Sequence, residues 1–144
     1  MIVKIKKAEG AFIPTYQTKQ SAGADISACL SEPLVIRAHE RALVPTGLFM
    51  EIPENYEVQL RPRSGNALKK GLTLLNTPGT IDSDYRGEVK VLLYNASSDD
   101  VIINNGDRIA QAIVAPVIKV EWQECEQLST TVRSSGGWGS TGEK

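Results

Sequence analysis

The segment Gly79–Gly87, which we expect to form a hairpin with a polar tip, concentrates groups that can do acid–base chemistry. It holds two carboxylates, Asp82 and Asp84, together with Tyr85 and Arg86. A well-placed carboxylate can act as general base toward a water molecule without help from a histidine. Asp82 is therefore a candidate base, although Asp, Ser and Gly also build simple turns because they tolerate unusual backbone angles.

Arginines in motifs that contain Gly or Ser form a second group. A guanidinium presents several N–H donors in one plane, which fits phosphate oxygens, and glycine lets backbone N–H groups approach the same oxygens. A single arginine near a turn more often pairs with a carboxylate, but five of them in a chain of net charge −1 favour a polyphosphate ligand. The five are Arg61, Arg63, Arg86, Arg108 and Arg133.

A short helix is expected directly after Arg63. Ser64 can cap it, residues 67–70 favour a helix, and Gly71 suits a left-handed end. A capped helix start points free N–H groups outward and can bind an anion, as an alternative to an ordinary structural cap. Two other polar residues fit less specific patterns: Asp25 in a tight turn entering a strand, and Gln111 as a strand-edge residue or a ligand contact.

Rare residue types exclude several other chemistries. His39 is the single histidine, which argues against a zinc site and excludes any Ser–His or Cys–His pair that does not use it. Cys29 and Cys125 are too few for a disulfide framework, and we expect two buried thiols.

The elements that position the candidate groups are expected to be strands. Apolar residues alternate with polar ones over residues 3–5, 56–60, 89–91 and 118–122, as in half-buried strands. Further β-rich runs lie at 34–36, 43–44, 48–50, 101–103 and 112–114, with turn signals between them. Many short strands at near-even spacing predict an all-β barrel or sandwich.

Length, charge and composition limit the class of protein. The chain has 144 residues, enough for one domain with a core. The net charge of −1 argues against a nucleic-acid or membrane-surface binder. Without a targeting signal or a membrane-length apolar run, a cytoplasmic protein is expected. Four of the twelve glycines fall in residues 134–142, which we expect to form a mobile tail.

Five of these segments, in this order, resemble the five motifs of the trimeric dUTP pyrophosphatases (dUTPases). They start at Ala22, Arg63, Gly79, Gly106 and Arg133, and the last ends in Gly-Gly-Trp-Gly-Ser-Thr-Gly. The resemblance implies a distorted, jelly-roll-like β-barrel over residues 1–132, a flexible C-terminal lid over 133–144, and a homotrimer with shared active sites. It also implies Mg²⁺-dependent hydrolysis of dUTP to dUMP and pyrophosphate, which keeps uracil out of DNA and supplies dUMP for dTMP synthesis.

The resemblance also implies a role for each matching residue. Asp82 matches the carboxylate that activates the attacking water, and Tyr85 the ring that leaves no space for a 2′-hydroxyl. Asp25 and Gln111 match residues on the α-phosphate side, reaching the metal through water. The phosphate loop is matched by Arg63, Ser64 and Gly65; the uracil pocket by Asn76, Gly79, Thr80, Ile81 and Lys90; and the lid by Arg133, Trp138, Gly139, Ser140 and Thr141.

Two alternatives stay open. A dCTP deaminase shares the implied fold, but it is expected to carry a glutamate on the strand after the hairpin, and residues 89–94 hold no carboxylate. A non-catalytic β-trimer that binds a nucleotide is the other, and its mark would be loss of the hairpin aspartate, whereas Asp82 is present.

Overall fold

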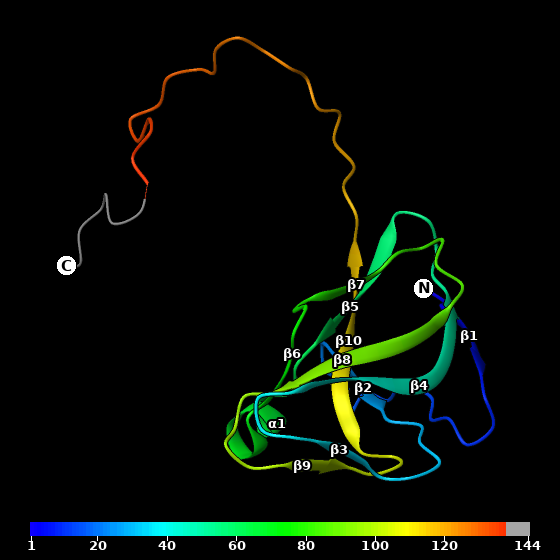
Figure 1. Cartoon of the computed structure of the whole chain (residues 1–144). Helices are drawn as coiled ribbons and strands as arrows, with labels where there is room; N and C mark the ends of the chain where they lie inside the picture. Colours follow the sequence, from blue (N-terminus) through cyan, green and yellow to red (C-terminus); the bar gives the residue numbers. More distant parts are fainter. Residues whose placement is uncertain (138–144) are drawn as a thin grey trace.

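The computed structural model describes residues 1–137, which are built mostly from β-strands (Figure 1). The prediction of an all-β chain with one short helix is confirmed. The helix is α1 (Ser64–Lys70), and the strands are β1 (Lys4–Lys7), β2 (Ala24–Ser27), β3 (Leu34–Ile36), β4 (Arg41–Glu51), β5 (Tyr56–Arg61), β6 (Leu72–Leu74), β7 (Gly79–Ile81), β8 (Glu88–Asn95), β9 (Val101–Ile103) and β10 (Arg108–Pro116).

The strands form two four-stranded sheets and one strand pair. The first sheet has the order β1-β4-β8-β6, the second has the order β2-β10-β5-β7, and β3 pairs with β9. All the pairings are antiparallel. Within the described residues, hydrogen bonding therefore makes three sheets rather than one closed ring of strands.

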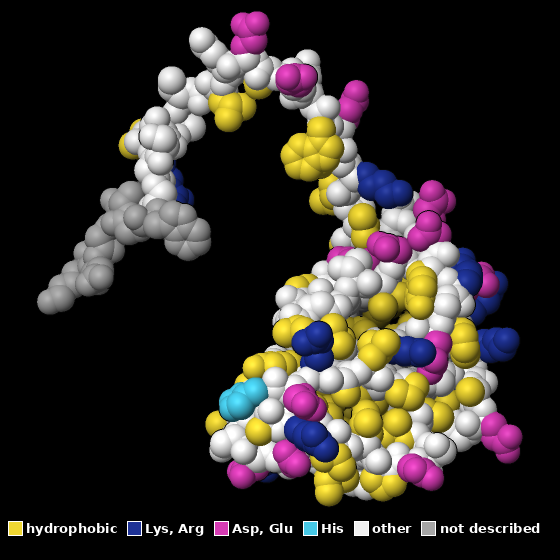
Figure 2. Space-filling model, in the orientation of Figure 1, with side chains coloured by type: hydrophobic (Ala, Val, Ile, Leu, Met, Phe, Trp, Pro, Cys, Tyr) yellow, Lys and Arg dark blue, Asp and Glu magenta, His cyan; other side chains and the backbone are white. Residues whose placement is uncertain are grey.

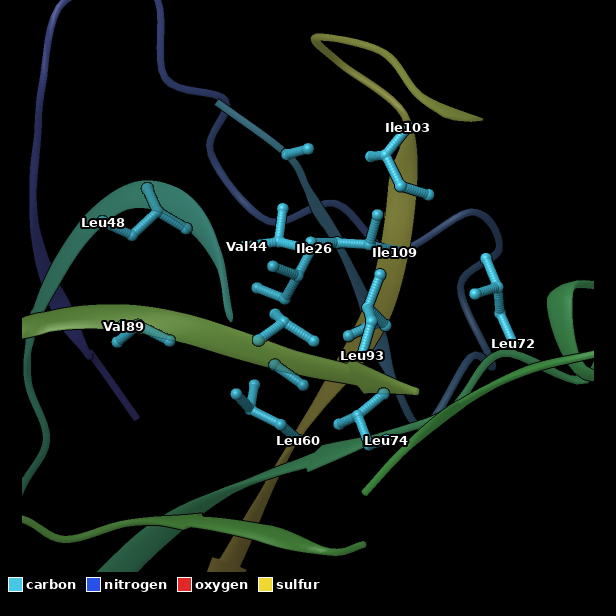
Figure 3. Close-up of a cluster of buried hydrophobic side chains, with 14 of the residues drawn as sticks. Ile26, Val44, Leu48, Leu60, Leu72, Leu74, Val89, Leu93, Ile103 and Ile109 are labelled. Carbon is cyan, nitrogen blue, oxygen red and sulfur yellow. The ribbon is translucent and has the colours of Figure 1, made fainter. Parts of the chain in front are cut away.

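One hydrophobic core holds the sheets together. Along β8, Val89, Val91 and Leu93 are buried while the residues between them are more exposed, as the alternation predicts. Figure 3 shows the buried side chains of different strands, among them Ile26 and Leu60, converging on one cluster. Full burial of one such side chain stabilises the fold by roughly 1.5–3 kcal/mol. This core is the rigid support for the loops that carry the candidate residues.

Helix α1 begins one residue earlier than predicted. Arg63 occupies the N-cap position with extended backbone angles, φ −92° and ψ 130°, and no side chain caps the helix. Ser64 is thus the first helical residue, and the capping prediction is wrong. The reason is that Arg63 takes the extended conformation while its side chain binds Asp25 instead. The predicted end at Gly71 is confirmed, with φ 63°.

The segment after Pro116 leaves the body as an extended stretch (Figure 1). The strand predicted over residues 118–122 is absent from the described part of the chain. Its apolar side chains are exposed, Trp122 by 91%, rather than half-buried as the alternation predicts. Figure 2 shows hydrophobic side chains spaced along this segment. The alternation shows which side chains would share a strand face, but no strand among residues 1–137 pairs with this segment.

The cysteines also depart from expectation. Cys125 is exposed on the same extended segment, and Cys29 is only partly buried, with its Sγ 3.9 Å from the Glu9 carbonyl oxygen. Both are free thiols. In the described range, no helix has the length and apolar character needed to span a bilayer.

Candidate active site

One pocket lies over the hairpin between β7 and β8. Five predicted site residues line it, and Leu43 and Glu88 complete its wall; the five are Thr80, Ile81, Asp82, Tyr85 and Lys90. The hollow is about 480 Å³ in volume. Strand β7 pairs with β5 and β8 pairs with β4, so the predicted pairing of the two arms is wrong, and the hairpin is a connection between two sheets. Both four-stranded sheets therefore support the wall of this pocket.

The tip of the hairpin is fixed by local hydrogen bonds. The Arg86 guanidinium donates to the Ser83 carbonyl oxygen at 2.6 Å and to the Tyr85 carbonyl oxygen at 3.1 Å. The Tyr85 hydroxyl donates to the Glu88 carbonyl oxygen at 3.0 Å. A Cβ added to Gly87 would lie only 2.5 Å from Tyr85 Cζ, so glycine is required for the ring to pack against this backbone. Arg86 therefore uses one terminal nitrogen of its guanidinium to shape the turn.

The carboxylates of this pocket differ in their contacts. Asp82 is exposed, and within residues 1–137 its side chain makes no hydrogen bond or ion pair. Glu88 accepts a hydrogen bond from the Gly47 N–H at 3.0 Å, and its other oxygen lies 3.4 Å from Lys90 Nζ. Glu88 is thus engaged, whereas Asp82 is available to a water molecule or a ligand.

A second pocket, about 300 Å³ in volume, gathers the other predicted group at the start of α1. The sheet register explains this, because β10 runs between β2 and β5 and pairs Gln111 with both Asp25 and Arg61. It therefore brings the three motifs together although they are far apart in the sequence. The pocket is lined by Asp25, Arg63, Ser64, Gly65 and Gln111, with Gln17, Ser21, Ala22 and Gly23.

Asp25 is the electrostatic centre of this second pocket. It is only 9% exposed, and its two carboxylate oxygens accept from Arg63 Nε at 2.7 Å and from an Arg108 terminal nitrogen at 3.0 Å. The Asn66 side chain donates to the Arg108 carbonyl oxygen at 2.8 Å, and Gln111 donates to the Pro62 carbonyl oxygen at 2.9 Å. Asp25 thus carries a carboxylate that two guanidinium groups neutralise.

The remaining predicted residues lie outside both pockets. Asn76 sits beside Gly79, where an added Cβ would lie 3.2 Å from Asn76 Nδ2. Arg133 lines neither pocket and donates to the Gly136 carbonyl oxygen at 2.9 Å on the extended segment. The predicted lid residues Trp138, Gly139, Ser140 and Thr141 lie outside the described residues.

Sequence reasoning missed several wall residues. Glu88 alternates with Val89 and is predicted as a strand residue with no role in a site, and it is the first residue of β8. Leu43 faces the hairpin from β4, and Gln17 and Ser21 come from an irregular loop. No sequence pattern pointed to these wall residues as part of a site, because periodicity assigns residues to elements but carries no signal for proximity.

The described residues include no cluster of three or more His, Cys, Asp or Glu side chains that could hold a metal ion. The donor set of the second pocket nevertheless fits a hydrated Mg²⁺, because Mg²⁺ favours oxygen ligands and keeps several of its waters. Each oxygen of Asp25 accepts one arginine hydrogen bond and retains a further lone pair. Asp25 and Gln111 could therefore reach a metal-bound water.

The chain is similar over nearly its whole length to one group of proteins. A family model described as dUTPase matches residues 9–142. A Treponema denticola protein called "Deoxyuridine 5'-triphosphate nucleotidohydrolase" is 54% identical over 142 residues, which cover 99% of each chain. A Brucella suis protein of the same name is 55% identical over 143 residues, covering 98% of this chain and 91% of that one.

Solved structures of dUTPases have a fold similar to that of this chain. The Staphylococcus bacteriophage 80alpha dUTPase with dUPNHPP has a TM-score of 0.88 and 26% identity, and 98% of each chain is covered. A mutant dUTPase from phage phi11 of S. aureus, described as coordinating a structural Mg(II) ion, has a TM-score of 0.81 and 24% identity over 90% of this chain and 100% of that one.

Proposed function

The chain belongs to the dUTPase family and is a dUTP diphosphatase, and from this premise we propose how its residues divide the work. The substrate is dUTP and the products are dUMP and pyrophosphate. The uracil and the sugar bind in the hairpin pocket, and the phosphates bind along the pocket at the start of α1. The reaction removes dUTP before it can enter DNA and yields dUMP for dTMP synthesis in the cytoplasm.

The available carboxylate of Asp82 carries this proposal. It is exposed in the hairpin pocket and makes no side-chain contact with the described residues, whereas Glu88 and Asp25 are both engaged. Asp82 accepts a proton from a water as that water forms a bond to the α-phosphorus. The bond from the α-phosphorus to the bridging oxygen breaks, and pyrophosphate leaves. General-base assistance of this kind is worth about 10²–10⁴-fold in rate.

Selectivity for the base and the sugar is proposed to come from the hairpin. Backbone groups of Thr80 and Ile81, the Asn76 side chain next to Gly79 and the strand at Lys90 surround the pyrimidine. The Tyr85 ring, fixed by its hydrogen bond to the Glu88 carbonyl oxygen, fills the space that a 2′-hydroxyl would need. A ribonucleotide would meet the ring and would leave its hydroxyl unpaired, and both effects disfavour UTP.

Phosphate binding is proposed to use the second pocket. Arg63 donates to Asp25 and, at 3.4 Å, to the Arg108 carbonyl oxygen, and its remaining donors, with the N–H groups of Ser64 and Gly65, can meet phosphate oxygens. Mg²⁺ held by the triphosphate would neutralise phosphate charge, and Asp25 and Gln111 would bind its waters. The metal supplies charge stabilisation, while the chain supplies position.

A homotrimer with shared sites is part of the proposal. The two pockets share no lining residue in one chain. The exposed apolar side chains of Ile118, Val120 and Trp122 have a strand-like alternation, and no strand among residues 1–137 pairs with them, which supports pairing with another copy. Residues 133–144 would then serve as a lid over a neighbouring site, with Arg133, Ser140 and Thr141 on the γ-phosphate and Trp138 over uracil.

A deaminase is the alternative to exclude by experiment. Glu88 does place a carboxylate in the hairpin pocket, but the Gly47 N–H and Lys90 engage it. Incubation of the purified protein with each deoxynucleoside triphosphate and Mg²⁺ tests the function. We expect pyrophosphate from dUTP only, and ammonia release from dCTP, or no turnover at all, would contradict the proposal.

A further inference from the structure

Glu88 is a partly buried carboxylate that has no role in the proposed reaction. Its side chain is 24% exposed and reaches across the sheet from β8 to β4. Oε1 accepts the hydrogen bond from the Gly47 N–H, and Oε2 faces Lys90 Nζ. A carboxylate with both oxygens engaged is poorly suited to proton transfer and well suited to holding neighbouring groups in place.

The partner of Glu88 on β4 is an irregular and buried piece of backbone. Strand β8 pairs with Pro45 and with Leu48 but skips the two residues between them, Thr46 and Gly47. Gly47 is buried with φ +66°, so its N–H has little access to water and needs a partner within the protein. The Glu88 carboxylate is that partner. It thus ties the start of β8 to a fixed bulge in the core.

The same residue also supports the Tyr85 ring. The Tyr85 hydroxyl donates to the Glu88 carbonyl oxygen, and the ring packs against Gly87 so closely that no Cβ would fit there. The position of the ring therefore depends on the backbone of residues 87–88. That backbone is in turn held by the side chain of Glu88 on the Gly47 N–H.

We propose that Glu88 is a positioning residue that sets the preference for deoxyribose over ribose. By accepting the Gly47 N–H, it anchors residues 87–88 to the β4 bulge and keeps the Tyr85 ring against the sugar. This proposal rests on the proposed function, in which Tyr85 excludes the 2′-hydroxyl. The reach of the side chain matters more than its charge, because an N–H group donates to any well-placed oxygen.

Two substitutions separate reach from charge. Glu88→Gln keeps the length and an acceptor oxygen but loses the charge opposite Lys90, whereas Glu88→Asp keeps the charge and is one methylene too short for Gly47. The readout is the ratio of kcat/KM for dUTP to kcat/KM for UTP. We expect Glu88→Asp to lower this ratio about tenfold and Glu88→Gln to leave it within about threefold.

Glu51→Gln is the matched control. Glu51 lies on the same sheet in an exposed ion pair with Lys4 at 2.8 Å, and it lines no wall of the hairpin pocket. We expect the ratio to be unchanged in this variant. Tyr85→Phe tests the same chain of contacts without altering Glu88, because it removes only the hydroxyl bond to the Glu88 carbonyl oxygen, and we expect a smaller ratio there too.

Amide hydrogen exchange at Gly47 gives a readout that does not depend on activity. We expect slow exchange in the wild type and in Glu88→Gln, and exchange faster by about tenfold or more in Glu88→Asp. If the wild type itself fails to prefer dUTP, the proposed role of Tyr85 fails while this exchange measurement still tests the anchor. The proposal is overturned if Glu88→Asp keeps both slow exchange and the dUTP preference, or if Glu88→Gln loses the preference as fully as Glu88→Asp.

Discussion

The two pockets of this chain each contain an aspartate near a glycine, and the fold gives these aspartates opposite surroundings. Asp82 lies exposed on a hairpin, without a side-chain partner among residues 1–137. Asp25 lies on β2, nearly buried and bound by Arg63 and Arg108. A partnered carboxylate neutralises cations and fixes their positions, whereas a free one can accept a proton. The fold therefore leaves one of these carboxylates available to accept a proton and holds the other in place with two arginines.

Replacing the free aspartate is expected to have the largest effect. Asp82→Asn keeps the shape of the side chain but removes the proton acceptor, so we expect kcat for dUTP to fall by about 10²–10⁴-fold. Binding of dUPNHPP and thermal stability should stay close to the wild type, because no described contact is lost. Steady-state kinetics with calorimetric binding measures both, and near-normal turnover would remove Asp82 from its role.

Removing the predicted lid should affect both pockets at once. Truncation before Arg133 leaves all of the described strands in place, so the body should keep its circular dichroism spectrum. We expect turnover to fall by about a hundredfold, because a substrate that is held less exactly in line reacts more slowly. A truncated protein with full activity would show that the body alone closes the site.

Mixing inactive variants can show whether the two pockets act across chains. Asp82→Asn disables the hairpin pocket, and Arg63→Ala disables the phosphate pocket. If each site combines pockets from different subunits of a trimer, refolding equal amounts of the two variants together should restore about a quarter of all sites. These are the sites whose two pockets are both intact. The test is dUTP hydrolysis after joint refolding, with each variant refolded alone as control. No gain of activity in trimers shown by native mass spectrometry to be mixed would contradict shared sites.

Replacing Asp25 is expected to change mainly the stability of the fold. Asp25→Asn weakens the bonds to Arg63 and Arg108, both of which are partly exposed to water. We expect a loss of about 1–3 kcal/mol in the free energy of unfolding, less than for a fully buried pair. Urea denaturation measures this loss. An unchanged urea midpoint in Asp25→Asn would contradict the claim that Asp25, unlike Asp82, is held by stabilising contacts with two arginines.

The hairpin pocket could be predicted from sequence largely because its residues are neighbours. Asp82 and Tyr85 lie in one nine-residue run, so the chain itself keeps them together. The second pocket requires the strand register, because Asp25 and Gln111 meet only when β2 pairs with β10. The motif order supplied that information through a family resemblance and not through periodicity.

Other features were beyond the reach of sequence patterns. The contact between Glu88 and Gly47 joins residues 41 positions apart at a bulge, and alternation cannot reveal where a strand takes in extra residues. Residues 118–122 show the converse error, since an alternating run shows which side chains share a face but not whether a partner strand is present.

A single turnover of dUTP in ¹⁸O-labelled water tests the central claim most directly. If Asp82 activates a water that attacks the α-phosphorus, the label enters dUMP and the pyrophosphate stays unlabelled, as mass spectrometry of both products would show. The Asp82→Asn variant should form labelled dUMP far more slowly under the same conditions. Label in the pyrophosphate would place the attack on the β-phosphorus and contradict the account.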